Sequence, residues 1–279
     1  MTARAARLPD GRRLHLQHGP IDLILEAWGP PAAVAGAWAR AAARFAPLLD
    51  ELVAELPALR SAAPHRFAGH TARRMAAAVA PFRPAFLTPM AAVAGAVADT
   101  VLAAMAEAGD LDRAYVNDGG DIALHLTPGT AITAAIAARP GFPDRTTVRH
   151  PDPVRGIATS GWRGRSFSLG IADAVTVLAA TAAEADAAAT MIANAVDLPG
   201  HPAVSRRPAR ALQPDSDLGD RPVTTGVGRL APAEIAAALA TGAAAAEAMR
   251  ARGLIAAAAL FLAGESRVVP HPAVRDAAW

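Results

Sequence analysis

The chain has 279 residues, 53% of them hydrophobic and 19% charged, so it can bury a sizeable core and lies far from the disordered class of proteins. Its formal net charge is only +2, and its 27 basic residues are all arginine and scattered, which argues against the clustered basic face of a nucleic-acid-binding protein. Cysteine is absent, which excludes disulfides, thiolate metal sites and cysteine nucleophiles.

The N-terminal third predicts strands followed by helices. Residues 14–29 alternate enough for a pair of strands. Pro31 suits the first turn of a helix that runs to about Phe45, and residues 46–60 continue as a second amphipathic helix. Residues 61–86 are rich in Pro, His and Arg and predict loops around one short helix.

A nearly all-apolar helix follows. Thr88 is placed to cap it, Pro89 suits its first position, and the apolar run continues to Ala108 before Gly109 ends it. Because it is apolar on every side, we expect this helix to lie at the centre of the fold.

The remaining elements are predicted by the same signals. Strands are predicted at 113–116, 122–126, 130–140 and 172–181, with a loop over 140–155. A helix from Thr181 to 197 and a connection over 198–222 follow, then a strand near Val223 and a helix over 232–252. The chain continues with a hairpin over 254–269, with Glu265 and Ser266 as its turn. Strands in adjacent pairs with helices between them favour an α+β class, with antiparallel sheets flanked by helices. We expect one domain over 1–279, and a division into two sub-lobes near residues 85 and 222 stays an alternative.

The stretch "NDGGD", Asn117 to Asp121, lies between two short strands. Adjacent glycines allow positive φ and let backbone N–H groups approach a ligand, while Asp118 and Asp121 suit a hydroxyl, a ring N–H or a metal-bridged phosphate. From spacing alone a plain hairpin turn is favoured, because Asp-Gly and Gly-Gly are strong hairpin signals.

Two further segments contain polar residues that could bind a ligand. The "GIATSG" loop offers donors from Thr159 and Ser160, with Arg163 and Arg165 nearby, although an exposed turn explains it equally well. Asp186 and Thr190 are four residues apart on a predicted helix, so they share a face and could supply oxygen ligands to Mg²⁺. From spacing alone, a polar pair on a solvated helix face is the favoured interpretation. No His-Glu-x-x-His occurs, and no long apolar run of signal-peptide type, so zinc and membrane partners are not expected and the expected location is the cytoplasm.

In this order, "TPMAAVAGAVAD", "VNDGGDI", "GIATSG" and "ADAAAT" resemble the ApbE-like superfamily, and the whole pattern is most similar to its cytoplasmic branch that carries only an uncharacterised-family label. The best-known members are FAD:protein FMN transferases, which use Mg²⁺ to split FAD and attach FMN to a serine or threonine of an acceptor protein. The resemblance implies a T-fold-related α+β architecture.

The resemblance also implies roles for particular residues. By the match, the flavin-contacting residues are Asn117, Asp118, Gly119, Gly120, Asp121, Thr159, Ser160 and Gly161, and the metal ligands are Asp186 and Thr190. Ser168, in a segment that departs from the family's pattern, is a further candidate for cofactor binding. A backbone carbonyl of the 89–99 helix would join the metal. Asp121 and Asp173 are the candidate bases.

Two departures from the family's pattern bear on activity. The family has an Ala-Lys-Gly segment, and the position of its lysine is occupied by Ala94 in this chain. The family's His-x-x-Asp-Pro-x-Thr-Gly segment is replaced by "SFSLGIAD". That histidine is implicated in transfer. The leading hypothesis is therefore a flavin-nucleotide (FAD or FMN) and Mg²⁺ binding protein with FMN transfer or FAD pyrophosphate cleavage; the alternatives are a non-catalytic flavin or metabolite binding module and a small-molecule enzyme that re-uses the pocket. A protein acceptor and a homodimer are left open as partners.

Overall fold

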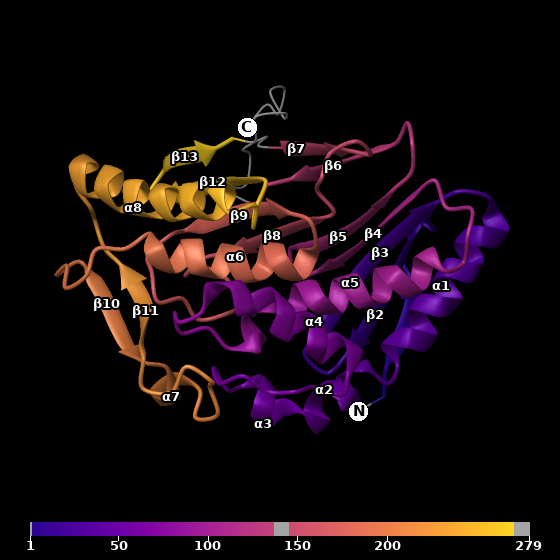
Figure 1. Ribbon diagram of the computed structural model, residues 1–279, viewed down its shortest axis with the longest axis horizontal. Coiled ribbons are helices and arrows are strands. Elements are labelled where there is room, and N and C mark those ends of the chain that lie inside the picture. The colour runs from indigo at the N-terminus through magenta and orange to yellow at the C-terminus, as the bar shows by residue number, and fades with distance from the viewer. Residues whose placement is uncertain (1, 137–144, 271–279) are drawn as a thin grey trace.

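A nine-stranded antiparallel sheet runs through the computed structural model, which describes residues 2–136 and 145–270 (Figure 1). In spatial order its strands are β1 (Arg4–Arg7), β2 (Arg13–His18), β3 (Ile21–Trp28), β4 (Arg113–Asp118), β5 (Asp121–Leu126), β8 (Gly156–Ser160), β9 (Ala174–Ala179), β12 (Ala257–Leu262) and β13 (Glu265–Val269). The connections from β3 to β4 and from β9 to β12 contain helices, the one from β5 to β8 contains a separate pair of strands, and the other neighbours are joined by turns or loops. The expected α+β class with antiparallel sheets is confirmed.

Helices cover one face of the sheet. Two of them, α5 (Val93–Ala106) and α6 (Ala182–Ala195), lie at the centre, with α1 (Pro31–Phe45) beside the first and α8 (Pro232–Ala251) beside the second (Figure 1). A further layer lies outside α5 and α6. It consists of α4 (His70–Val79), the 3₁₀ turns η1 (Ala80–Phe82) and η2 (Pro89–Ala92), and the short helices α2 (Leu48–Ala54) and α3 (Leu56–Leu59).

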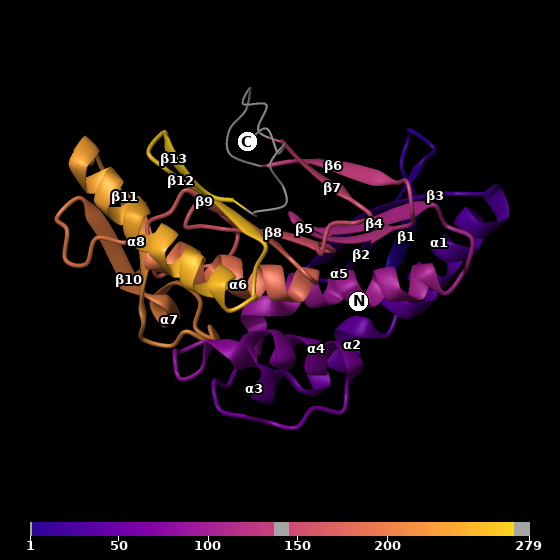
Figure 2. The same cartoon turned by 45° about the horizontal axis from the view of Figure 1, so that its top comes forward.

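The opposite face of the sheet is partly covered by a hairpin of β6 (Ala131–Ala135) and β7 (Arg145–Arg149), which lies over β5 (Figure 2). A second, smaller core forms there, and it includes Leu124, Leu126 and Val148. The fold therefore buries apolar side chains on both faces of its middle strands.

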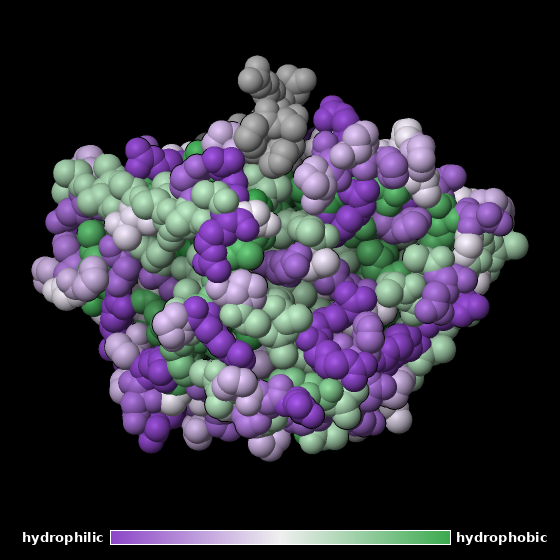
Figure 3. Space-filling view, viewed as in Figure 1, coloured by the Kyte–Doolittle hydropathy of each residue, from purple (hydrophilic) through white to green (hydrophobic). Residues whose placement is uncertain are grey.

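A separate two-stranded unit lies at one end of the molecule. It pairs β10 (Val204–Pro208) with β11 (Pro222–Val227), with the short helix α7 (Ala209–Leu212) between them (Figure 1). The visible face of the molecule mixes hydrophilic and hydrophobic residues, and a pale hydrophobic band follows the alanine-rich α8 (Figure 3).

Most predicted elements are confirmed, and α1 has the predicted bounds. The N-terminal pair of strands is three strands, because the polar segment Arg4–Arg7 adds an exposed edge strand. The second helix divides into α2 and α3 because Pro57 has no N–H for a continuous helix and its ring would clash with the preceding turn.

Three other predictions were wrong in detail. The expected loop over 140–155 contains β7, whose Thr and Val residues pair with β6; residues 137–144 lie outside the described residues. The expected connection over 198–222 contains β10 and α7. In the last hairpin the turn is Ala263–Gly264, both with positive φ, so Glu265 and Ser266 begin β13.

The segment from Pro89 to Ala106 is long and apolar enough to cross a membrane by length and composition, but 56% of it is buried inside the protein. It packs against α1, α4, α6, β4 and β5, as the sequence predicts for a central helix. Its apolar character is therefore explained by its position in the core.

Gly95 on α5 lies in close contact with the start of α6. A Cβ atom at this position would lie 2.2 Å from the carbonyl oxygen of Ala182 at the start of α6. Backbone cannot move away as easily as a side-chain tip, so only glycine fits there.

We expect Gly95→Ala to lower the free energy of unfolding by roughly 1–3 kcal/mol or more, because the added methyl group separates α5 from α6. The matched control is Gly36→Ala in α1, where an added Cβ has its nearest neighbour at 3.7 Å. That substitution should be neutral or stabilising by up to about 1 kcal/mol, because alanine favours helix more than glycine does. Urea unfolding of both variants measures the difference; equal effects would contradict the close helix contact.

Candidate functional site

The β4–β5 hairpin turns at Gly119 and Gly120, which have φ values of 64° and 119°. Positive φ at both central residues is typical of the tight hairpin turns that match the twist of the strands. Asp118 and Asp121 are directly opposite each other across this turn. The hairpin interpretation of "NDGGD" is therefore confirmed, and the same turn places two carboxylates side by side.

The alternation of the two strands decides where these side chains point. Asp118 and Asp121 are buried, at 5% and 9% exposure, on the face where Val116 and Ala123 join the core under the helices. Asn117 points to the opposite face, and its Oδ1 accepts the backbone N–H of Gly120 at 2.8 Å. The motif thus places polar side chains on both faces of the sheet.

A carboxylate from each central helix caps the other helix. Asp99 of α5 accepts the N–H groups of Ala182 and Ala183 at 3.1 and 3.0 Å, and Asp186 of α6 accepts the N–H of Gly95 at 3.1 Å. Backbone N–H groups at a helix start have no partner within the helix, so both carboxylates satisfy buried donors that would otherwise be unpaired. This reciprocal capping joins the N-terminal ends of α5 and α6 and fixes the position of Asp186.

Burial and neighbouring charges together shift the pKa values of Asp118, Asp121 and Asp186. Burial raises the pKa of Asp118 to about 7 and the pKa of Asp121 to about 7, and the nearby charge of Asp118 adds to the effect on Asp121. Burial, followed by repulsion from Asp121, raises the pKa of Asp186 well above its usual range. The charge of Asp118 thus raises the pKa of both Asp121 and Asp186, and a nearby cation would favour the ionised form of these carboxylates. Asp118, Asp121 and Asp186 are called the carboxylate cluster below.

Arg165 supplies positive charge next to this cluster. It lies in the loop after β8 and its Nη2 is beside Gly119, where a Cβ atom would lie only 2.4 Å from it. Its charge lowers the pKa of Asp118 and of Asp121, against the larger effect of burial.

The Thr-Ser-Gly segment is also adjacent to the cluster. The backbone N–H of Thr159 donates to Asp121 Oδ1 at 3.1 Å, and its hydroxyl is 2.8 Å from that of Thr176 on β9. Ser160 ends β8 and is half-buried. Gly161 packs against the backbone of Asp173, where a side chain would not fit.

Two predicted site residues have partners outside the cluster. Ser168 is buried near the end of α6, where its Oγ lies 3.4 Å from Asn194 Oδ1. Asp173 accepts hydrogen bonds from Trp162, Arg163 and the backbone of Ala263. Both are held by the surrounding fold in these positions, and their roles toward a ligand stay predictions.

Asp186 and Thr190 lie one helical turn apart on α6, and Thr190 is half-buried. Within residues 2–136 and 145–270, no group of three or more His, Asp or Glu side chains is arranged to hold a metal ion by itself. Mg²⁺ usually binds one or two carboxylates and takes the rest of its ligands from water and substrate phosphates. This donor set therefore suits Mg²⁺ that arrives with a nucleotide better than a permanently caged metal.

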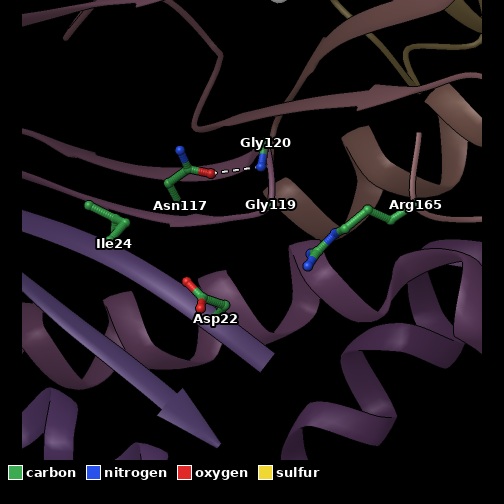
Figure 4. Close-up of a pocket in the computed structure, with 6 residues that line it drawn as sticks. All are labelled: Asp22, Ile24, Asn117, Gly119, Gly120 and Arg165. Carbon is green, nitrogen blue, oxygen red and sulfur yellow. Dashed lines mark hydrogen bonds between the residues drawn. The ribbon is translucent and has the colours of Figure 1, made fainter. Parts of the chain in front are cut away.

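An open pocket of about 220 Å³ lies beside the turn (Figure 4). Its lining residues come from β3, the β4–β5 hairpin and the loop after β8, and they are Asp22, Ile24, Asn117, Gly119, Gly120 and Arg165. Sequence reasoning missed Asp22 and Ile24, because only the pairing of Ile24 with Asn117 across β3 and β4 brings them to the turn. It also missed the capping role of Asp99.

Comparison with known proteins gives related findings. A family model described as AbpE bacteria matches residues 5–268. A UPF0280 protein of Methanothrix thermoacetophila is 41% identical over 110 residues, which are 39% of this chain and 46% of that protein. A UPF0280 protein of Methanosphaerula palustris is 42% identical over 110 residues, with the same shares. The matches thus cover less than half of each of these relatives.

One solved structure has a similar fold. The crystal structure of the apo form of the flavinyl transferase ApbE of Pseudomonas stutzeri matches with a TM-score of 0.50 and 13% sequence identity, over 98% of this chain and 96% of that chain. At this identity the likeness concerns the fold alone.

The raised pKa values predict how stability depends on pH. Asp118 and Asp121 have pKa values of about 7 in the folded chain against an ordinary 3.8, so between these values the folded state binds more protons than the unfolded state. Stability then falls as pH rises through this window, because each pKa unit corresponds to about 1.4 kcal/mol. We expect the melting temperature without divalent cations to decrease from pH 5 to pH 8.

Asp121→Asn should reduce that decrease, because one buried carboxylate no longer has to ionise. Asp50→Asn, at an exposed position on α2, is the matched control and should leave the pH dependence unchanged. A melting temperature of the Asp121→Asn protein that depends on pH as strongly as that of the original protein would contradict the assignment.

Proposed function

Because the chain belongs to the AbpE bacteria family, we propose that it binds a flavin nucleotide, FAD or FMN, together with Mg²⁺ at the β4–β5 turn. The observation that carries the proposal is the carboxylate cluster, in which burial raises all three pKa values and the charge of Asp118 raises those of Asp121 and Asp186 further. The likeness of the fold to a flavinyl transferase supports a flavin as the organic part of the ligand.

The residues of this chain divide the binding task. The carboxylate of Asp186 and the hydroxyl of Thr190 are the proposed metal ligands, on one face of α6. The turn from Asn117 to Asp121 and the segment from Thr159 to Gly161 are the proposed flavin-contacting groups. Bound Mg²⁺ would neutralise charge on the phosphates of the nucleotide.

The enzyme version of the proposal is cleavage of the FAD pyrophosphate. The hydroxyl oxygen of an acceptor serine or threonine, or of water, forms a bond to the phosphorus on the FMN side. The bond from that phosphorus to the bridging oxygen breaks and AMP leaves, while the hydroxyl proton passes to a base. The products are FMN esterified to the acceptor, or free FMN when water attacks, together with AMP.

Asp121 is the better candidate for the base. Its pKa of about 7 is close to the value that favours proton transfer near neutral pH. Asp173, the other candidate, already accepts hydrogen bonds from Trp162, Arg163 and Ala263, so it would have to leave these partners to act.

One observation favours a second function, a binding module without turnover. The segment that replaces the family's histidine motif is held by internal bonds. The hydroxyl of Ser168 donates a hydrogen bond to Asn194 Oδ1 on α6. Asp173 accepts the backbone N–H of Ala263 in the β12–β13 turn. A role in structure explains these residues without any transfer chemistry. A cytoplasmic location, a protein acceptor and a homodimer stay predictions.

Turnover separates the two versions. Purified protein is incubated with FAD and Mg²⁺, with and without an acceptor peptide that contains threonine, and FMN and AMP are followed by chromatography. The enzyme version expects AMP release that is lost on adding a chelator and reduced about 100-fold or more in Asp121→Asn, within the range of general base contributions. Tight FAD binding without any AMP would establish the binding module.

The metal site has its own test. We expect MgCl₂ to raise the melting temperature in the presence of FMN, and Thr190→Val to weaken this effect because it removes one oxygen ligand and keeps the side-chain shape. Thr241→Val on α8 is the control, because Thr241 is an exposed helical threonine outside the site. An unchanged magnesium effect in Thr190→Val would remove Thr190 from the site.

A further inference from the structure

The pocket beside the turn has two donor side chains, those of Asn117 and Arg165, and one carboxylate, that of Asp22. Asn117 Oδ1 is occupied by the N–H of Gly120, so the amide NH₂ group is what Asn117 can offer a ligand (Figure 4). Arg165 projects from the opposite wall and brings its guanidinium to the same opening (Figure 4). The carboxylate of Asp22 is hydrogen-bonded to His15 at 3.1 Å.

Arg165 differs from the neighbouring Arg163 in its partners. Arg163 forms an ion pair with Asp173 at 2.5 Å. Arg165 has no carboxylate within ion-pairing distance among residues 2–136 and 145–270; its interactions are the longer-range ones with Asp118 and Asp121. An exposed guanidinium without an ion-pair partner at the wall of a pocket is a suitable group for an anion.

The place of Arg165 depends on the turn. Its guanidinium lies over Gly119, and a side chain at that position would occupy the same space. Gly119 therefore does more than allow positive φ, because it leaves room for the guanidinium of Arg165 directly above the backbone. Asp118 and Asp121 lie on the other face of the strands, under the helices, so their carboxylates do not line the pocket.

We infer that Arg165, together with the amide of Asn117, binds a phosphate group of the ligand and thereby selects phosphorylated over unphosphorylated molecules. A planar guanidinium donates two parallel hydrogen bonds to two oxygens of one phosphate, and the Asn117 NH₂ group adds a third donor. The inference rests on the proposed function only for the flavin part of the ligand; the phosphate contact can be tested without it.

The test compares FMN with riboflavin, which differ by one phosphate group, by titration of flavin fluorescence in a magnesium-free buffer. Arg165→Ala should weaken FMN binding by roughly 10- to 100-fold, the usual effect of losing hydrogen bonds to a charged group, and should leave riboflavin binding unchanged. Arg165→Lys should recover part of the FMN affinity, because it restores the charge without the paired donors. Arg163→Ala is the matched control and should bind FMN like the original protein.

A second titration uses inorganic phosphate, followed by amide chemical shifts of Gly119 and Gly120. Phosphate should shift these signals in the original protein and not in Arg165→Ala, and acetate at the same ionic strength reports any general anion effect. If no flavin binds but this difference is seen, the flavin proposal fails and the phosphate site stands. Equal losses of FMN and riboflavin affinity in Arg165→Ala, or phosphate shifts that persist in that variant, would overturn the inference.

Discussion

The contact on which the rest of the structure depends is the crossing of α5 and α6 at their N-terminal ends. Gly95 allows the backbones to touch, and Asp99 and Asp186 each cap the other helix. Both capping carboxylates lose water in this position, and burial raises the pKa of each. The backbone N–H groups they accept offset part of that cost. Asp186 is fixed in its position by this structural bond.

The sheet contributes the other half of the site through simple alternation. In β4 and β5, Asp118 and Asp121 point toward the helices, and Asn117 points away from them. A two-residue turn joins the strands, so five residues supply both a buried acidic face and an open, donor-rich face. The two faces meet at this turn, where Arg165 is close enough to lower the pKa of Asp118 and Asp121.

The cluster is an unfavourable arrangement in the absence of a cation. Burial disfavours the charged form of Asp118, Asp121 and Asp186, and the charge of Asp118 adds to this effect at Asp121 and Asp186. Clusters of this kind reduce stability near neutral pH, so they are more readily explained by ligand binding than by folding. By contrast, Asp173 and Ser168, although part of the segment that departs from the family's pattern, have partners that the fold itself supplies.

The sequence by itself determined the element order, the α+β class, the central apolar helix, the hairpin at Gly119 and Gly120, and, through ordered motifs, the family. These depend on periodicity, capping and turn chemistry, which act over a few residues. Only the tertiary structure decided that Asp99 and Asp186 cap opposite helices, that Asp22 and Ile24 join the turn, and that Arg165 lies over Gly119. Such contacts depend on strand register and helix crossing between segments far apart in the chain, and local spacing contains no information about either.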